Sequence, residues 1–163
     1  MRPRPTLVLA LIAVLTVGLA AGCGSNNKSS GSAKSTSTST PAITKAQFLK
    51  EGNAICARGN RQIGNAANTL FPKSGGKPSQ AKLNTFARTT IIPSVQRQID
   101  EIKALGAPAG GQATVNAIVG AAQAALDKGK RDPAVLTTNG PGPFKRANQL
   151  AKSYGLRACA AGS

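Results

Sequence analysis

Residues 44–70 read TKAQFLKEGNAICARGNRQIGNAANTL. Apolar or small side chains recur in this stretch at spacings of three and four, which is the period of one face of an α-helix. These side chains are Phe48, Gly52, Ile55, Gly59, Ile63, Ala66 and Leu70. The pattern predicts a helix within the segment Pro41–Leu70, with Cys56 on the flank of its apolar face.

The start of this helix carries local signals of its own. Thr44 and Gln47 have the spacing of a capping box, and Ile43 is placed to pack against Phe48. Glycines inside a helix weaken it by up to about 1 kcal/mol each relative to alanine. Those on the apolar face, Gly52 and Gly59 among them, are therefore expected to serve the close approach of a second helix.

Three further amphipathic segments follow. They are Gln80 to about Leu105, Gly111–Gly129 and a last helix that starts at Pro143. Because Pro93 lacks a backbone donor and collides with the preceding turn, we expect a kink or break near Ile91–Ile92. Gly155 has the position of a left-handed C′ residue, with Leu156 completing a Schellman motif. Since no segment alternates like a strand, the sequence predicts an all-α fold, a small four-helix up-and-down bundle.

The chain before the first helix has two compositions. Arg2 and Arg4 are followed by an almost purely aliphatic run, Thr6–Ala21, which is the layout of a secretory signal peptide. Gly24–Thr40 is rich in serine and threonine and has no apolar period, so it is expected to be a disordered linker. The predicted organisation is a signal peptide at 1–22, a flexible tether at 23–40 and a helical domain at 41–163.

The junction Leu19-Ala20-Ala21-Gly22-Cys23 resembles the lipobox of bacterial lipoproteins. The resemblance implies a diacylglycerol group on the sulfur of Cys23, cleavage just before it, and a protein held on the outer face of the bacterial cytoplasmic membrane. Two or more acyl chains give durable attachment. The alternatives are an ordinary signal peptide that leaves Cys23 over, or an uncleaved anchor helix. The apolar run is shorter than the roughly 20 residues that a spanning helix needs.

Cysteine usage supports a second prediction. The sequence has three cysteines. If Cys23 carries lipid, Cys56 and Cys159 remain as a pair in an oxidising compartment. A metal site is the competing interpretation, but the sequence has no histidine and only these two thiols remain. We therefore predict a disulfide between Cys56 and Cys159 that closes nearly the whole domain.

The charge balance is strongly basic, with 21 Lys or Arg against five Asp or Glu and a net charge of +16. Such a balance favours anionic partners such as anionic lipids or cell-wall polymers. It equally suits a solvated cationic surface that keeps a small domain soluble. Nucleic acid is not expected as a partner, because the basic residues are scattered and few aromatic side chains are available for base stacking.

A sparse pattern runs through the predicted domain. It consists of Phe48, Ala54 and Cys56, then Leu105 and Pro108, and finally Tyr154-Gly155-Leu156 with Cys159. The pattern resembles a family of small exported helical proteins of actinobacteria, often lipoproteins, with one cysteine near each end. The resemblance covers about Thr44 to Cys159 and implies the fold, the cysteine bridge and the location, but no active site. Gly52 departs from it, because such proteins more often have a larger residue there.

Residues for catalysis are scarce. Without histidine the chain lacks the usual general base and the commonest metal ligand. Asp100 and Glu101 are adjacent, so on a helix they point about 100° apart and do not converge. Residues 74–77, SGGK, match a serine–lysine motif of acyl enzymes and echo a phosphate loop, but they lack the further residues that either requires. We predict a noncatalytic protein with no cofactor and no metal site.

Two classes of function remain. In the first, a membrane-anchored lipoprotein, attached through lipid on Cys23, binds or organises an anionic component or a protein partner at the cell envelope. In the second, the domain is a carrier with a pocket for a small apolar ligand between its helices. The small side chains on the helix faces suit close packing or a cleft equally well, and the sequence leaves the oligomeric state open.

Overall fold

The computed structural model describes residues 42–71 and 76–161. The predicted signal peptide, the tether and Cys23 lie outside these residues. Contacts divide the chain into two units, Met1–Ser37 and Thr38–Ser163, and the described residues all belong to the second. That unit supplies every core side chain described below and both ends of the disulfide, so it contains its own core and its own covalent crosslink.

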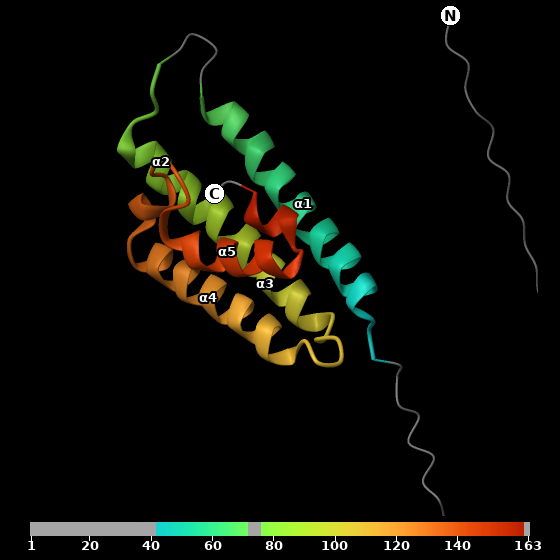
Figure 1. Cartoon of the computed structure of the whole chain (residues 1–163). Coiled ribbons are helices and arrows are strands. Elements are labelled where there is room, and N and C mark those ends of the chain that lie inside the picture. Colours follow the sequence, from blue (N-terminus) through green and yellow to red (C-terminus); the bar gives the residue numbers. More distant parts are fainter. Residues whose placement is uncertain (1–41, 72–75, 162–163) are drawn as a thin grey trace, which may run out of the picture. The chain divides into compact units, whose positions relative to one another are not determined.

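Helices make up the described part of the chain, and no strand occurs within it (Figure 1). The elements are α1 Lys45–Leu70, α2 Gln80–Phe86, the π-helix η1 Ala87–Ile91, α3 Ile92–Ala104, α4 Gln112–Arg131, the 3-10 helices η2 Pro133–Leu136 and η3 Gly142–Phe144, α5 Lys145–Tyr154, and the 3-10 helix η4 Arg157–Ala160. Because α2, η1 and α3 follow one another directly, the unit has four main rods. Successive rods run in alternating directions in Figure 1, which confirms the predicted four-helix bundle.

The start of α1 has the predicted capping box. The side-chain oxygen of Thr44 accepts a hydrogen bond from the backbone N–H of Gln47 at 3.2 Å. The side chain of Gln47 accepts one from the backbone N–H of Thr44 at 3.0 Å. Ile43 packs against the core cluster that contains Phe48. Two of the N–H groups that an α-helix leaves unpaired at its start are thus satisfied.

The second rod passes Pro93 without breaking. The backbone N–H of Ile92 bonds to the carbonyl oxygen of Ala87, five residues back, and this closes the π-helix η1. A proline inside an α-helix lacks a donor and collides with the carbonyl group four residues earlier. The wider turn just before Pro93 moves that carbonyl group aside. The discontinuity expected near Ile91–Ile92 is therefore a π-turn within a continuous rod.

The end of α5 forms the predicted Schellman motif. Gly155 has a φ of 109°, in the left-handed region that favours glycine. The N–H of Leu156 bonds to the carbonyl oxygen of Ala151 at 2.8 Å, and that of Gly155 bonds to Lys152 at 3.2 Å. These bonds satisfy carbonyl groups at the helix end and turn the chain back towards α1.

A single cluster of buried side chains forms the core. It consists of Phe48, Ile55, Cys56, Ile102, Val115, Ile118, Ala151 and Leu156. Helix α4 packs on α3 and α5, while α1 packs on α3 and on η4. The bundle is therefore closed between its first and last segments by the short C-terminal turn after α5.

Glycines on the packed face of α1 permit this closure. A Cβ at Gly52 would lie 2.7 Å from a methyl carbon of Leu156, which is fully buried. A Cβ at Gly59 would collide with the side-chain amide of Gln98 on α3. The predicted role of these glycines in close approach is confirmed: Leu156 occupies the space that a side chain at position 52 would need.

The predicted cysteine pair is also confirmed. The sulfur atoms of Cys56 on α1 and Cys159 on η4 are 2.04 Å apart, and their Cα atoms are 5.0 Å apart. The disulfide spans 103 positions of sequence. It fixes the C-terminal turn to the middle of the first helix.

We predict that Cys56→Ser lowers the free energy of unfolding of the unit Thr38–Ser163 by about 4 kcal/mol. On the chain-entropy model a bridge closing a loop of about 100 residues contributes about 4.7 kcal/mol. Chemical denaturation measures the difference. The matched control is the unsubstituted chain in a dithiol reductant, which should unfold together with the variant. Equal stability of the oxidised chain and the variant would contradict the prediction.

Candidate functional site

A cavity of about 530 Å³ lies between the helices of the bundle. All four rods contribute to its wall, together with the loop between η2 and η3 and the C-terminal turn. Its walls are predominantly apolar, with residues such as Ile63, Ile91, Val95, Ile99, Val119 and Leu136. It is partly open to solvent. A half-enclosed apolar space of this size is the usual form of a site for a small molecule.

Small side chains line the cavity at places where a large one would fill it. They include Gly64 on α1, Ala122 on α4 and Ala147 on α5. A Cβ at Gly64 would meet no atom within 4 Å. The glycines of α1 therefore have two different surroundings. Gly52 and Gly59 allow Leu156 and Gln98 to approach the helix closely, whereas the space next to Gly64 is open.

Among the described residues, four polar side chains and no charged one take part in the lining. The four are Asn60, Gln98, Thr138 and Asn148. The first three donate hydrogen bonds to backbone carbonyl oxygens, at 2.7 Å, 3.3 Å and 3.2 Å respectively. Within residues 42–71 and 76–161 the side-chain amide of Asn148 makes no hydrogen bond. Asn148 is thus the lining side chain whose donors and acceptor are all free for a ligand.

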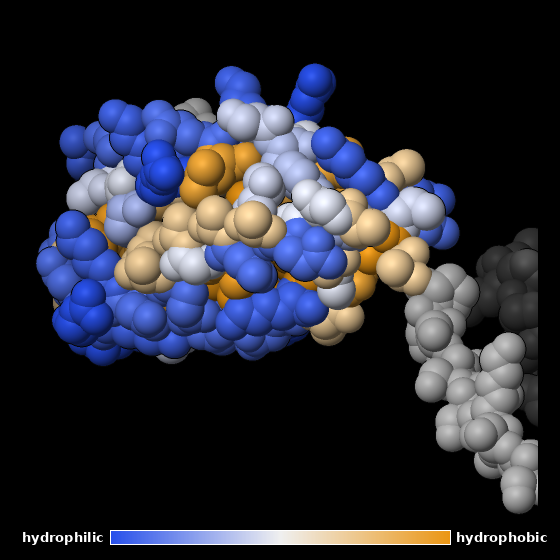
Figure 2. Space-filling view, turned by 60° about the horizontal axis from the view of Figure 1, so that its bottom comes forward, coloured by the Kyte–Doolittle hydropathy of each residue, from blue (hydrophilic) through white to orange (hydrophobic). Residues whose placement is uncertain are grey.

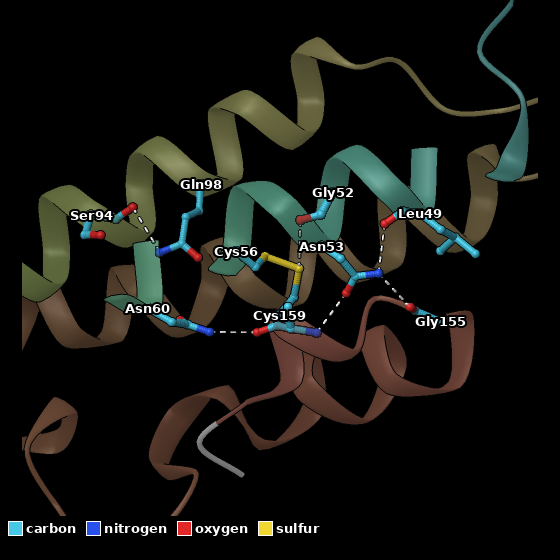
Figure 3. The surroundings of a disulfide bond; sticks show 10 residues. Leu49, Gly52, Asn53, Cys56, Asn60, Ser94, Gln98, Gly155 and Cys159 are labelled. Atoms are coloured by element: carbon cyan, nitrogen blue, oxygen red, sulfur yellow. Dashed lines mark hydrogen bonds between the residues drawn. A yellow bond between two sulfur atoms is a disulfide. The ribbon is translucent and has the colours of Figure 1, made fainter. Parts of the chain in front are cut away.

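The disulfide is part of the cavity wall, since both of its cysteines line the cavity. Figure 3 shows how the C-terminal turn around it is held against α1. The amide of Asn53 donates to the carbonyl oxygen of Gly155 at 3.0 Å, and its oxygen accepts from the N–H of Ala158 at 2.8 Å. Such a wall is fixed before any ligand arrives, which reduces the ordering cost of binding.

The acidic residues considered as catalytic candidates have ordinary surface partners. Glu101 accepts from Arg58 of α1 at 2.6 Å. Asp100 accepts instead from Gln96, one turn earlier, at 3.1 Å. The two carboxylates therefore do not converge on one point. Across the described segments, no group of three or more His, Cys, Asp or Glu side chains is placed to hold a metal ion.

Parts of the sequence motifs lie outside the described residues, namely Ser74 and Gly75 of the serine–lysine motif and all of the lipobox, including Cys23. Within the described part of the chain, no helix combines the length and apolar character needed to cross a membrane. Figure 2 shows one face of this unit, with hydrophilic residues along its margins and hydrophobic residues reaching the surface between them.

No known protein family, curated protein or solved structure matches the chain.

Proposed function

We propose that the chain is a noncatalytic binding protein that carries a small apolar ligand in the cavity between its helices. The observation that supports this proposal is the cavity itself, because about 530 Å³ lies within the range of about 300–1,000 Å³ that is usual for small-molecule sites. Its lining is mostly apolar and carries no charged side chain. Removal of apolar ligand surface from water, at about 25 cal/mol per Å², is then the main source of affinity.

The form of the cavity suits reversible carriage. Part of its wall is the loop that contains Gly140 and Gly142, both with positive φ, and part is the crosslinked turn at Cys159. Because the helices and the crosslink hold the interior open, a ligand needs little rearrangement to enter. Nothing near the cavity resembles an acid, a base or an activated nucleophile within the described residues, so the proposed role is binding without chemistry.

We predict that Gly64→Phe weakens ligand uptake at least tenfold. The probe is N-phenyl-1-naphthylamine, an uncharged apolar dye whose emission rises on transfer from water to an apolar site. Its titration into the unit Thr38–Ser163 should show saturable binding of one dye per chain. Because Gly64 lines the cavity, a phenylalanine at position 64 is expected to occupy part of the site.

Gly120→Phe is the matched control. Gly120 lies on α4, where a Cβ would also meet no atom within 4 Å, but it does not line the cavity. Both substitutions remove a helix glycine, so circular dichroism should show that both variants stay helical. Absence of saturable dye binding, or equal weakening by the two substitutions, would contradict the carrier function.

The location of the carrier is part of the same proposal. The lipobox resemblance at Gly22-Cys23 supports export and lipid attachment at Cys23, on the outer face of the cytoplasmic membrane. The Cys56–Cys159 disulfide is consistent with this location, since such bonds persist in oxidising compartments. The family of small exported helical proteins with terminal cysteines has the same features.

We predict that intact-mass analysis of the native chain finds Cys23 as its first residue, with the mass of a diacylglycerol group and any further acyl chain added. Cys23→Ser should abolish the added mass and leave the protein uncleaved. Retention of residues 1–22 in the native protein, or an unmodified Cys23, would disprove lipid attachment.

A second candidate function is the binding of an anionic lipid or wall polymer at the cell envelope. The net charge of +16 supports it. The few acidic residues neutralise little of the described surface. Glu101 pairs with Arg58 and Asp127 pairs with Lys130, so each neutralises a single cation. Most of the cations among the described residues therefore lack an acidic neighbour.

We predict that the unit Thr38–Ser163 binds vesicles of anionic phospholipid and that this binding falls steeply as salt rises from about 0.05 M to 0.5 M, because exposed charges are screened over about 10 Å at 0.1 M. Vesicle sedimentation measures the bound fraction, with neutral vesicles of the same size as the control. Salt-insensitive binding, or equal binding to neutral vesicles, would contradict an electrostatic role.

A further inference from the structure

The free amide of Asn148 lies on a cationic edge of helix α5. Residues three and four positions apart are neighbours on a helix surface. Lys145 and Lys152 are three positions before and four positions after Asn148, so the two lysines flank it along one edge. Both lysines are exposed, and neither takes part in an ion pair within the described residues. An uncommitted amide at the cavity thus stands between two uncommitted ammonium groups.

No acidic side chain of its own segment offsets this charge. All five acidic residues precede Pro133 in the sequence. The segment from Pro133 to the end of the chain provides the cavity loop, α5 and the C-terminal turn, and its charged side chains are all cations. Ion pairs elsewhere join α1 to α3 and close one turn of α4. The charged side chains that this segment brings to the edge of the cavity are therefore all positive.

The size of the cavity limits what can enter it. One water occupies about 30 Å³ of liquid and a methylene group is of similar size, so about 530 Å³ holds on the order of fifteen to twenty such groups. That is the size of one long hydrocarbon chain. The interior has no charged side chain with which a buried ionic group could pair, and an unpaired buried charge is strongly unfavourable. A charged group on the ligand must therefore stay at the edge.

We propose that the cavity binds a single-chain amphiphile with an anionic oxygen head group. The hydrocarbon chain lies among the apolar side chains of the cavity. The head group accepts a hydrogen bond from the side-chain amide of Asn148 and lies between the ammonium groups of Lys145 and Lys152. This assignment rests on the proposed carrier function and adds to it the chemical class of the ligand.

The test compares three ligands with the same twelve-carbon chain: dodecanoate, dodecyl phosphate and 1-dodecanol. Each displaces N-phenyl-1-naphthylamine from the unit Thr38–Ser163 at concentrations below micelle formation. We expect at least one of the two anions to displace the dye at a tenfold lower concentration than the alcohol. Preference for dodecanoate would assign a carboxylate head group, and preference for dodecyl phosphate would assign a phosphate. Either result supports the proposal.

Variants locate the head group. Lys145→Gln combined with Lys152→Gln should remove the advantage of the anions and leave displacement by dodecanol unchanged. Lys50→Gln combined with Lys103→Gln is the control, because it removes the same charge at exposed positions on α1 and α3 instead of α5. Asn148→Leu should weaken the anions about tenfold, because it removes the amide that donates to the head group.

The possible failures are distinguishable. Equal displacement by the alcohol and both anions would overturn the anionic head group and leave the carrier function standing. Equal effects of the two double lysine variants would overturn the position of the head group on α5. Absence of saturable dye binding would overturn the carrier function itself.

Discussion

The attachment of the C-terminal turn to α1 is the constraint on which the rest of the structure depends. Helix α1 packs on α3 on one side and on η4 on the other. The contact between the first and last segments of the bundle is therefore made by η4, a 3-10 helix of four residues. So short a segment holds its place only when it is fixed from outside. The Cys56–Cys159 bond and the hydrogen bonds of Asn53 do this. The side chain of Leu156 packs into the space that the missing side chain of Gly52 leaves, and so completes the contact between α1 and the C-terminal turn.

The same constraint makes the cavity possible. Atoms that line an empty space lose the dispersion contacts that a packed core provides, so a bundle of alanine and glycine with a large internal space is poorly stabilised by packing alone. A crosslink that lowers the entropy of the unfolded chain stabilises the fold without filling the interior. Stability supplied by the crosslink, and not by packing alone, therefore lets Gly64, Ala122 and Ala147 stay small where larger side chains would take up part of the site.

Local signals in the sequence are sufficient to predict the rods, the capping box at Thr44, the Schellman turn at Gly155 and, through cysteine counting, the bridge. The cavity is not predictable in this way. A glycine inside a helix does not by itself indicate what lies opposite: at Gly52 it is Leu156, more than a hundred positions later, and at Gly64 no atom lies within 4 Å. Pro93 predicts a discontinuity, but whether a kink or a π-turn results depends on the packing of the whole rod. No sequence pattern singles out Asn148. It matters because its side-chain amide has no hydrogen-bond partner among the described residues, and this depends on the tertiary structure.

The two candidate functions use different physical terms and are compatible within one molecule. Long-range attraction by net charge mainly raises the rate of encounter with anionic surfaces or ligands, and salt screens it. Burial of a hydrocarbon chain sets the residence time and requires an enclosed apolar wall. Its free energy depends little on salt between about 0.05 M and 0.5 M. In a chain with a net charge of +16 whose cavity, within the described residues, is lined by no charged side chain, the two terms are separated in space. An anionic amphiphile is a ligand that uses both contributions. Its head group is attracted by the surface cations, and its hydrocarbon chain is buried in the cavity. The cationic surface and the apolar cavity are then successive parts of one binding process.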